Sequence, residues 1–269
     1  MKIGIFDSGI GGLSLLYELA SRLPDASFLY YADSENAPYG EKSADEIIAL
    51  TERALIFLVD RGADAIVFAC NTATAAAAKT LRWKYPDRLI FGMEPAVNEA
   101  ARKIKTGKIL ATATPLTLRG EKYHALLGKT GAEERTVSLP LPMLVRYAEG
   151  DLFGRVLQIC DGAEDYVRKS LSDVTDNPDE LSAVVLGCTH FIYFTDVFRR
   201  LLPDRPIFNG ISGTASHVIR TLGLSSITLD TRNRADAIMR RTEFYISGKK
   251  ADEKSPEGFR NCLELLQKI

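Results

Sequence analysis

The strongest constraint on this chain is the regular alternation of short apolar runs with longer stretches of helical periodicity. Residues 3–6, 28–32 and 65–69 are short apolar runs, and a stretch with apolar residues at helical spacing follows each of them. Strands that alternate with helices form βαβ units, which build parallel sheets covered by helices on both faces. The pattern therefore predicts an α/β protein with mainly parallel sheets.

The same alternation continues to the end of the chain. The expected strands are residues 3–6, 28–32, 65–69, 89–93, 108–112, 136–139, 183–186, 207–208 and 226–229. The expected helices are residues 13–22, 44–61, 71–85, 116–127, 151–171, 195–202, 211–222 and 235–246. The charged residues 249–255 are expected to form an exposed segment.

Length and charge narrow the class of protein. The 269 residues are enough for one large or two modest domains, either of which can bury a core. The 34 basic and 35 acidic residues leave a net charge of −1, which argues against a general surface for nucleic acid or anionic membranes. No apolar stretch is long enough to span a bilayer or to act as a signal peptide. We therefore expect a cytoplasmic protein with no nucleic-acid or membrane partner.

Polar side chains gather at the carboxyl ends of the expected strands. In parallel α/β sheets, ligands bind beyond these ends. The polar residues found there are Asp7, Ser8, Asp33, Ser34, Cys70, Asn71, Thr72, Glu94, Thr114, Cys188, Thr189 and His190. We therefore expect the functional site along this edge.

Two of these strand ends resemble each other. Residues 65–72 read AIVFACNT and residues 183–190 read AVVLGCTH. Each combines a buried-type strand, a small residue, a cysteine and hydrogen-bonding residues at an expected helix start. The match predicts two related α/β halves, each with one thiol at the edge of its sheet. No short repeat of fixed length runs through the chain, which argues against a solenoid.

A pair of opposed thiols suits the inversion of a carbon centre by proton transfer, which needs a base on one face and an acid on the other. A thiol has an ordinary pKa of about 8.5, close enough to neutrality for either role, and a helix start lowers this pKa. Cys70 and Cys188 are the candidates, with a small buried core residue as the alternative for each. Cys160 and Cys262 lie in helical segments, where packing is the expected role, and all four thiols are expected to be free.

The glycine-rich segment DSGIGG at residues 7–12 has two interpretations. The first is a nucleotide-binding loop. Asp33 could then bind a ribose, but a dinucleotide-binding fingerprint needs a third glycine where Ser14 stands, and the lysine of a P-loop is absent. Alternatively, Asp7 and Ser8 hold an ammonium group or orient a base, unless Asp7 is only a helix N-cap. The turn at residues 38–40 either only reverses the chain or also lines the pocket.

Polar residues also follow the two cysteines. Asn71 with Thr72, and Thr189 with His190, could bind a carboxylate through donors at helix starts, or could only cap those helices. His190, two residues from Cys188, could tune the thiol or donate a proton. Because no cluster of His, Cys, Asp and Glu has metal-ligand spacing, no metal is expected.

Together these motifs resemble those of glutamate racemases of the aspartate/glutamate racemase superfamily, over nearly the whole chain. The resemblance rests on residues 6–12 (FDSGIGG), 33–34 (DS), 38–40 (PYG), 69–73 (ACNTA), 94–95 (EP), Thr114 with Thr117, and 186–191 (LGCTHF). The two cysteine motifs in this order and spacing are specific, whereas either one alone would not be.

The resemblance implies two pseudo-symmetric α/β domains with the active site at their interface, expected to comprise residues 1–95 with 210–269 and residues 96–209. It implies Cys70 and Cys188 as the proton-transferring pair, glutamate as the substrate, no pyridoxal phosphate, metal or nucleotide, a role in supplying D-glutamate for peptidoglycan, and often a homodimer. The matching substrate-contact positions are Asp7, Ser8, Tyr39, Gly40, Asn71, Thr72, Thr189 and His190. Further implied pocket positions are Thr114, Thr117 and Glu149, and the implied groups that help the thiols exchange protons are Asp7, Glu149 and His190.

The sequence departs from the family at two places. Ile192 and Tyr193 follow Phe191 where the family commonly has proline, and residues 209–212 (NGIS) replace a common Asp-Ser-type pair. The first departure alters packing behind the second thiol, and the second alters a pocket edge or a hinge. Aspartate or a hydantoin therefore remains the alternative substrate. Two other classes also remain: a non-catalytic scaffold on this fold, and a nucleotide-dependent enzyme that uses the glycine loop.

Overall fold

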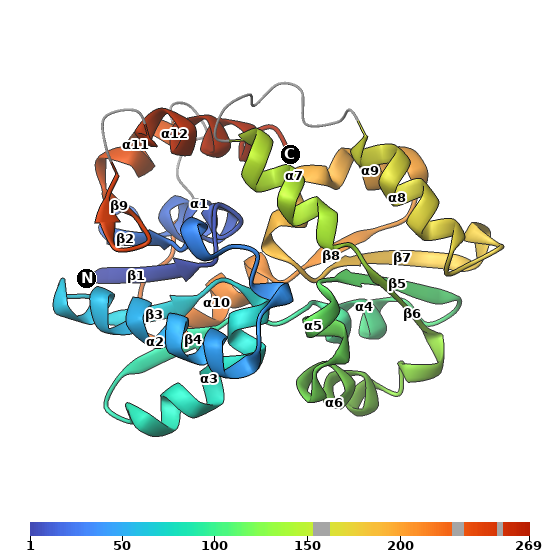
Figure 1. The fold of residues 1–269 in the computed structure, drawn as a ribbon, viewed down its shortest axis with the longest axis horizontal. Helices are drawn as coiled ribbons and strands as arrows, with labels where there is room; N and C mark the ends of the chain where they lie inside the picture. Colours follow the sequence, from blue (N-terminus) through green and yellow to red (C-terminus); the bar gives the residue numbers. More distant parts are fainter. Residues whose placement is uncertain (153–161, 228–233, 252–254) are drawn as a thin grey trace.

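Two sheets of mainly parallel strands form the computed structural model, which describes residues 1–152, 162–227, 234–251 and 255–269 (Figure 1). The larger sheet has the strand order β10-β9-β2-β1-β3-β4 and the smaller one β6-β5-β7-β8. The strands are β1 (Lys2–Asp7), β2 (Ser27–Ala32), β3 (Ala65–Phe68), β4 (Leu89–Gly92), β5 (Lys108–Ala113), β6 (Thr136–Pro140), β7 (Leu181–Leu186), β8 (Ile207–Asn209), β9 (Thr242–Ile246) and β10 (Lys249–Lys250). Only the β9–β10 pair is antiparallel among the described strands. The predicted fold class is confirmed.

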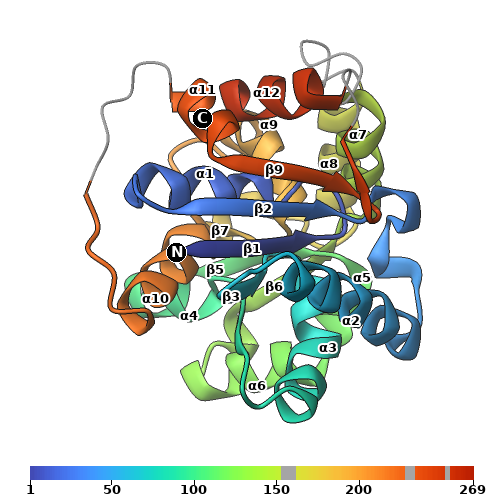
Figure 2. The ribbon, with the colours of Figure 1, turned by 90° about the vertical axis from the view of Figure 1, so that its left-hand side faces the viewer.

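Helices cover both faces of the larger sheet, with α1, α11 and α12 on one face and α2 and α3 on the other (Figure 2). The α-helices are α1 (Leu13–Arg22), α2 (Ala44–Asp60), α3 (Asn71–Lys84), α4 (Val97–Lys103), α5 (Pro115–Arg119), α6 (Glu121–Thr130), α7 (Pro142–Leu152), α8 (Ala163–Ser172), α9 (Thr195–Leu201), α10 (Ile211–Thr221), α11 (Arg234–Arg240) and α12 (Ser255–Leu266). The short 3₁₀ helices are η1 (Ser34–Asn36), η2 (Tyr39–Glu41), η3 (Glu133–Arg135), η4 (Pro178–Glu180) and η5 (Thr189–Phe194). Over the described ranges, no helix has the length and hydropathy needed to cross a membrane.

The central strands are apolar along almost their whole length because helices cover both faces. All four residues of β3 and five of the six in β1 are buried, which is typical of a parallel sheet in a layered α/β protein. The larger sheet takes strands from both ends of the chain, and the smaller sheet takes them from the middle. We propose that residues 1–95 with 210–269 form one domain and residues 96–209 the other, because this division follows the path of the chain between the sheets.

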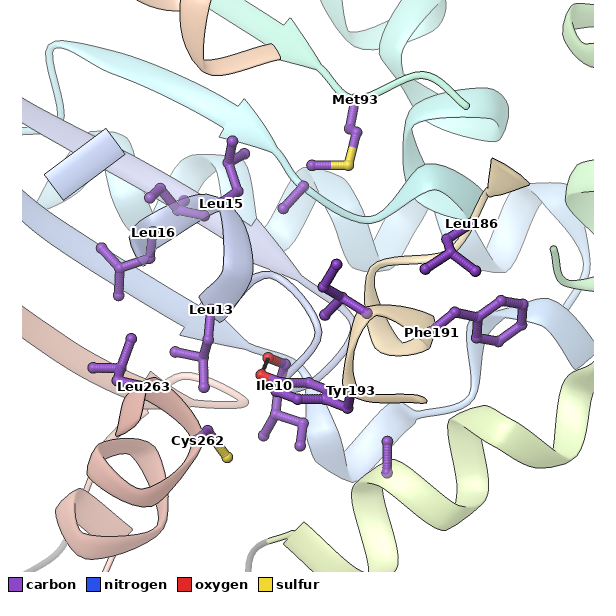
Figure 3. Packing of buried hydrophobic residues seen from close by; sticks show 14 of the residues in the cluster. Ile10, Leu13, Leu15, Leu16, Met93, Leu186, Phe191, Tyr193, Cys262 and Leu263 are labelled. Atoms are coloured by element: carbon purple, nitrogen blue, oxygen red, sulfur yellow. Dashed lines mark hydrogen bonds between the residues drawn. The ribbon is translucent and has the colours of Figure 1, made fainter. Parts of the chain in front are cut away.

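One hydrophobic core extends from the larger sheet into the smaller half. It joins Ile10 and Leu13, at the start of α1, with Leu186 of β7 and Tyr193 of η5 (Figure 3). Cys262 of α12 is fully buried in the same core. Side-chain packing therefore helps to set the placement of one sheet relative to the other.

Two predicted helices are interrupted by glycine. The helix expected over residues 116–127 is two helices, α5 and α6, because Gly120 between them is extended. The helix expected over residues 151–171 is not continuous. Helix α7 ends at Leu152, and residues 153–161, with Cys160, lie outside the described residues. Gly162 then precedes α8 with φ of 93°, a left-handed conformation that favours glycine.

The C-terminal prediction is wrong for residues 242–246. They form β9, which pairs in parallel with β2, after α11 has ended at Arg240. The run TEFYI contains the aromatic and β-branched residues that suit a strand, and the edge of β2 supplies its hydrogen-bond partners. Residues 226–227 are not in a strand, and the rest of the strand predicted there lies outside the described residues. Helices α4 and most of α7 were not predicted.

Candidate active site

Strand ends from both sheets meet at one cavity. It is narrow, with a cavity volume of about 20 Å³, far below the roughly 300–1,000 Å³ usual for small-molecule sites. Its lining residues follow β1, β2 and β3 of the larger sheet and β5, β6 and β7 of the smaller one. They are Ser8, Pro38, Tyr39, Gly40, Glu41, Cys70, Thr72, Thr114, Pro115, Pro142, Val145, Cys188 and His190.

Cys70 lies two residues after the end of β3 and is the N-cap of α3. The Ala73 N–H donates to its Sγ at 3.4 Å, and Ser8 Oγ lies 3.5 Å from the same sulfur. Burial, with a further contribution from the Asp7 carboxylate, raises the pKa of the Cys70 thiol to about 12 despite these two hydrogen bonds. The helix start does lower this pKa through the Ala73 N–H, but desolvation outweighs that effect, so the expected net lowering is not found for Cys70. Cys70 is a neutral thiol at neutral pH.

Cys188 occupies the equivalent position in the smaller sheet, between β7 and η5. Its half-buried Sγ lies 3.7 Å from Nδ1 of His190, and Nε2 of His190 lies 2.6 Å from Oε1 of Glu149. Burial disfavours the charged imidazole, but the hydrogen bonds with Cys188 and Glu149 outweigh burial and raise the pKa of His190 well above its ordinary value. His190 is therefore a cation at neutral pH and can donate a hydrogen bond to the Cys188 sulfur.

Asp7 connects the glycine loop to the smaller half. Its Oδ1 accepts from the Gly9 N–H at 3.0 Å, and its Oδ2 accepts from Thr189 Oγ1 at 3.1 Å. Complete burial raises the pKa of Asp7 to about 6, although the His190 charge acts in the opposite direction. A carboxylate with this pKa can take up and release a proton near neutrality.

Three threonine hydroxyls form a cluster that joins the halves. Thr72 Oγ1 lies 3.0 Å from Thr114 Oγ1 and 3.3 Å from Thr117 Oγ1, and the last two are 3.0 Å apart. Each hydroxyl can act as donor or acceptor, so the cluster can turn donors towards a carboxylate. Gly40 packs against it, because a Cβ there would lie 3.0 Å from Cβ of Thr114.

The structure brings most predicted site residues to the cavity wall and the others close behind it. The predicted residues on the wall are Ser8, Tyr39, Gly40, Cys70, Thr72, Thr114, Cys188 and His190. Behind it lie Thr117, which bonds to Thr114, Glu149, which bonds to His190, and the hydrogen-bonded pair Asp7 and Thr189, whereas Asn71 lines a neighbouring small cavity.

Two of the predicted contact residues, Asn71 and Tyr39, direct a polar group away from the cavity. Asn71 is buried at the wall of a neighbouring small cavity, and its Oδ1 has no hydrogen-bond partner within the part of the chain that the structure describes. The Tyr39 hydroxyl donates to Asp33 Oδ2 at 2.6 Å. Tyr39 therefore offers its ring to the cavity while its hydroxyl is occupied.

Gly9 and Gly11 in the loop after β1 are explained by close packing against the smaller half. A Cβ at Gly9 would collide with the Glu149 carboxylate. A Cβ at Gly11 would lie 2.8 Å from the His190 backbone nitrogen. These contacts account for the glycines without a bound phosphate.

The two departures from the family pattern have structural consequences. The Tyr193 hydroxyl donates to the Ile10 carbonyl at 3.1 Å, so it ties η5 to the glycine loop. Asn209 Oδ1 accepts from the Ile211 N–H at 3.1 Å, which fixes the start of α10. Both side chains serve as structural links outside the cavity wall.

Some residues of the cavity wall were not predicted from the sequence. Pro142 and Val145 belong to α7, directly after β6, so the same strand-end rule could have found the start of α7. Glu41 directly follows the predicted turn at residues 38–40. Outside the site, the described residues contain no group of three or more His, Cys, Asp or Glu side chains arranged to hold a metal ion.

Comparison with known proteins places this arrangement among racemases. The family model for Asp/Glu/Hydantoin racemase matches residues 14–218. The glutamate racemase of Halothermothrix orenii is 40% identical over 270 residues and covers 100% of each chain. That of Campylobacter curvus is 45% identical over 229 residues, which are 82% of this chain and 83% of the relative.

Solved structures share the whole fold. Escherichia coli glutamate racemase, in complex with L-glutamate and the activator UDP-MurNAc-Ala, superposes with a TM-score of 0.76 at 25% identity and covers 93% of this chain and 99% of its own. Campylobacter jejuni glutamate racemase superposes with a TM-score of 0.73 at 28% identity, covering 100% and 99%. The aspartate racemase of Picrophilus torridus, at 17% identity and a TM-score of 0.54, shares the fold alone.

Proposed function

Because the chain belongs to the Asp/Glu/Hydantoin racemase family, we propose that it interconverts L- and D-glutamate with Cys70 and Cys188 as the two acid/base groups. The observation that carries the proposal is the placement of the two thiols at equivalent strand ends of the two sheets, where both line one small cavity. Relatives at 39–45% identity bear the name glutamate racemase, which favours glutamate over aspartate.

In the proposed reaction, a thiolate removes the α-proton from one face of the amino acid, and the electron pair of the broken C–H bond remains on the α-carbon. The thiol on the opposite face then delivers its proton to that electron pair. The configuration inverts, and the two sulfurs have exchanged protonation states. Each thiol must therefore serve as acid in one direction and as base in the other.

The surroundings of the two thiols support one acid and one base at the start of a turnover. Cys70 is protonated, because burial raises its pKa to about 12. Cys188 lies beside a cationic His190, which can donate a hydrogen bond to its sulfur, as the base role requires. For the opposite direction Cys70 must first lose its proton. Asp7, with a pKa of about 6 and an electrostatic interaction with Cys70, is placed to receive it.

The cavity offers hydroxyl and backbone donors to the carboxylates of the substrate. Among the described residues no Lys or Arg side chain lines it, whereas Ser8, Thr72 and Thr114 supply hydroxyls. The N-terminal ends of α3 and η5 add backbone N–H groups. A small dicarboxylate such as glutamate fits this set of donors.

We further propose that the enzyme works in the cytoplasm as a homodimer, without pyridoxal phosphate, metal or nucleotide, and supplies D-glutamate for peptidoglycan synthesis. These proposals rest on the family to which the chain belongs.

Single-thiol variants test the reaction. Cys70→Ser and Cys188→Ser should each abolish racemisation, measured by polarimetry, while circular dichroism shows an unchanged fold. Cys262→Ala serves as the control, because this thiol lies in the core away from the cavity wall and its loss should leave turnover intact. Wild-type turnover in either serine variant would remove that cysteine from the mechanism. Faster turnover of aspartate than of glutamate would overturn the proposed substrate.

A further inference from the structure

Glu149 lies in the half of the chain that carries Cys188, yet the other half holds its carboxylate. The Ile10 N–H donates to Oε1 at 2.7 Å, and Ser34 Oγ donates to Oε2 at 3.2 Å. Oε1 also bonds to His190 Nε2 at 2.6 Å. Hydrogen bonds from the loops that follow β1 and β2 therefore fix both carboxylate oxygens. Oε1 also forms the hydrogen bond with His190.

The Ile10 N–H is itself oriented from behind by Tyr30. The Tyr30 hydroxyl donates to the Gly9 carbonyl at 2.7 Å, which is the other end of the planar peptide unit that carries this N–H. Tyr30 is fully buried on β2, and burial raises the pKa of its phenol well above the ordinary value, so the hydroxyl remains a donor. A hydrogen bond at the carbonyl polarises the peptide and strengthens its N–H as a donor.

These contacts form one continuous chain from β2 to the second thiol. It runs from the Tyr30 hydroxyl through the Gly9–Ile10 peptide to Glu149, from there to His190, and ends at the Cys188 sulfur. Cys70 has different partners, Ser8 and the N–H at the start of α3. The two thiols thus depend on separate sets of hydrogen bonds.

We propose that Ser34 and Tyr30 are positioning residues for the Cys188 half of the reaction, holding the Glu149 carboxylate in the orientation in which it binds His190 beside the sulfur. Neither residue lines the cavity. This inference rests on the proposed two-thiol racemisation. It also explains why the glycine loop packs so closely: the loop must bring one backbone N–H to a carboxylate of the opposite half.

The test must follow each thiol separately, because racemisation rates cannot tell the two apart. L- and D-glutamate are equally stable. The values of kcat/KM in the two directions are therefore always equal, and a defect at one thiol lowers both. Exchange of the α-hydrogen with D2O by one remaining thiol isolates each half. Cys188 acts alone in a Cys70→Ser background, and Cys70 acts alone in a Cys188→Ser background.

Ser34→Ala and Tyr30→Phe each remove one hydroxyl from the chain. In the Cys70→Ser background we expect Ser34→Ala to slow exchange roughly tenfold, the order expected for one hydrogen bond to a charged group. Tyr30→Phe loses a hydrogen bond to a neutral peptide carbonyl and should slow exchange about fivefold. In the Cys188→Ser background exchange should change less than about twofold, and Ser34→Thr, which keeps the hydroxyl, should restore the rate. Matched controls are Tyr123→Phe and Ser138→Ala, which break a hydroxyl pair of 2.8 Å elsewhere in the smaller half.

A second readout does not depend on turnover. In the protein with both cysteines, alkylation of each thiol by iodoacetamide can be followed by peptide mass spectrometry across pH. The variants should shift the alkylation profile of Cys188 to higher pH and leave that of Cys70 in place. The other titratable groups near Glu149 and His190, namely Asp7, Tyr193 and Cys262, are unchanged in Ser34→Ala.

Equal effects of the variants on exchange and alkylation at both thiols, or no effect at Cys188, would overturn the proposal. If Tyr30→Phe fails to fold, Ser34→Ala alone is a sufficient test. A selective shift in Cys188 alkylation would support it. If the wild-type protein exchanged no glutamate hydrogen while this selective shift persisted, the proposed function would fail and the positioning role would stand.

Discussion

Replacing Asp7 by asparagine should stabilise the protein at neutral pH and remove most of its activity. Asp7 is fully buried, and burial is the main reason why its pKa is raised from 3.8 to about 6. Asparagine keeps the oxygen that accepts from the Gly9 N–H. Its amide can donate to the Thr189 hydroxyl, which can rotate to accept. The substitution therefore removes a buried charge with little change in shape.

The size of the effect follows from proton linkage. Because the folded protein holds the Asp7 proton more tightly than the unfolded chain, Asp7 contributes stability below pH 3.8 that is lost as pH rises through about 6. A shift of about two pKa units costs about 3 kcal/mol at neutral pH, at 1.36 kcal/mol per unit. About a third of this cost is present at about pH 4.5. The advantage of Asp7→Asn over wild type should thus grow by about 2 kcal/mol between about pH 4.5 and pH 7.

Urea unfolding of both proteins at these two pH values measures this difference. Asp196→Asn, at an exposed carboxylate, is the control and should show no such growth. Turnover of Asp7→Asn should fall by about 100-fold or more, the usual contribution of an acid/base group. A variant that is less stable than wild type at pH 7, or a difference that does not change with pH, would refute the reasoning about the buried charge.

Three further predictions concern residues around the site and the larger sheet. Gly9→Ala should lower kcat/KM at least about tenfold, because its Cβ would displace the Glu149 carboxylate; wild-type kinetics would contradict this. Arg241→Met should lower the free energy of unfolding by about 2 kcal/mol, since the guanidinium donates to four backbone carbonyls around the end of α1; an unchanged urea midpoint would argue against it. One guanidinium nitrogen of the exposed Arg146 donates to both carboxylate oxygens of Glu41, a residue of the cavity wall, at 2.7 and 2.8 Å. Glu41→Arg should change kcat/KM by about fivefold or less, as for exposed pairs, and adding Arg146→Glu should restore it; failure of the double variant to recover would exclude a role for the pair.

The strand-end rule located most of the site because it depends only on the order of elements. If residues 65–69 and 183–186 form parallel strands, Cys70 and Cys188 must lie at the carboxyl edges of their sheets. The rule says nothing about residues delivered by helices. Glu149 came from the family resemblance alone, because its place opposite His190 depends on how α7 packs against the glycine loop.

Other features depend on tertiary structure and could not be predicted locally. The residues of β9 follow a helical segment without a turn signal, and only the free edge of β2 makes them a strand. The pKa of Cys70 illustrates the same limit. A helix start predicts a lower value, but the burial that raises the pKa to about 12 is visible only in the packed structure.

Incubation with L-glutamate in D2O, without any added cofactor, tests the central claim most directly. Optical rotation and the NMR signal of the α-proton are followed in the same sample. The two-thiol account predicts that both decay together, because each inversion replaces the α-hydrogen with solvent deuterium by way of a thiol. Unchanged rotation and an unchanged α-proton signal in a folded protein would contradict it.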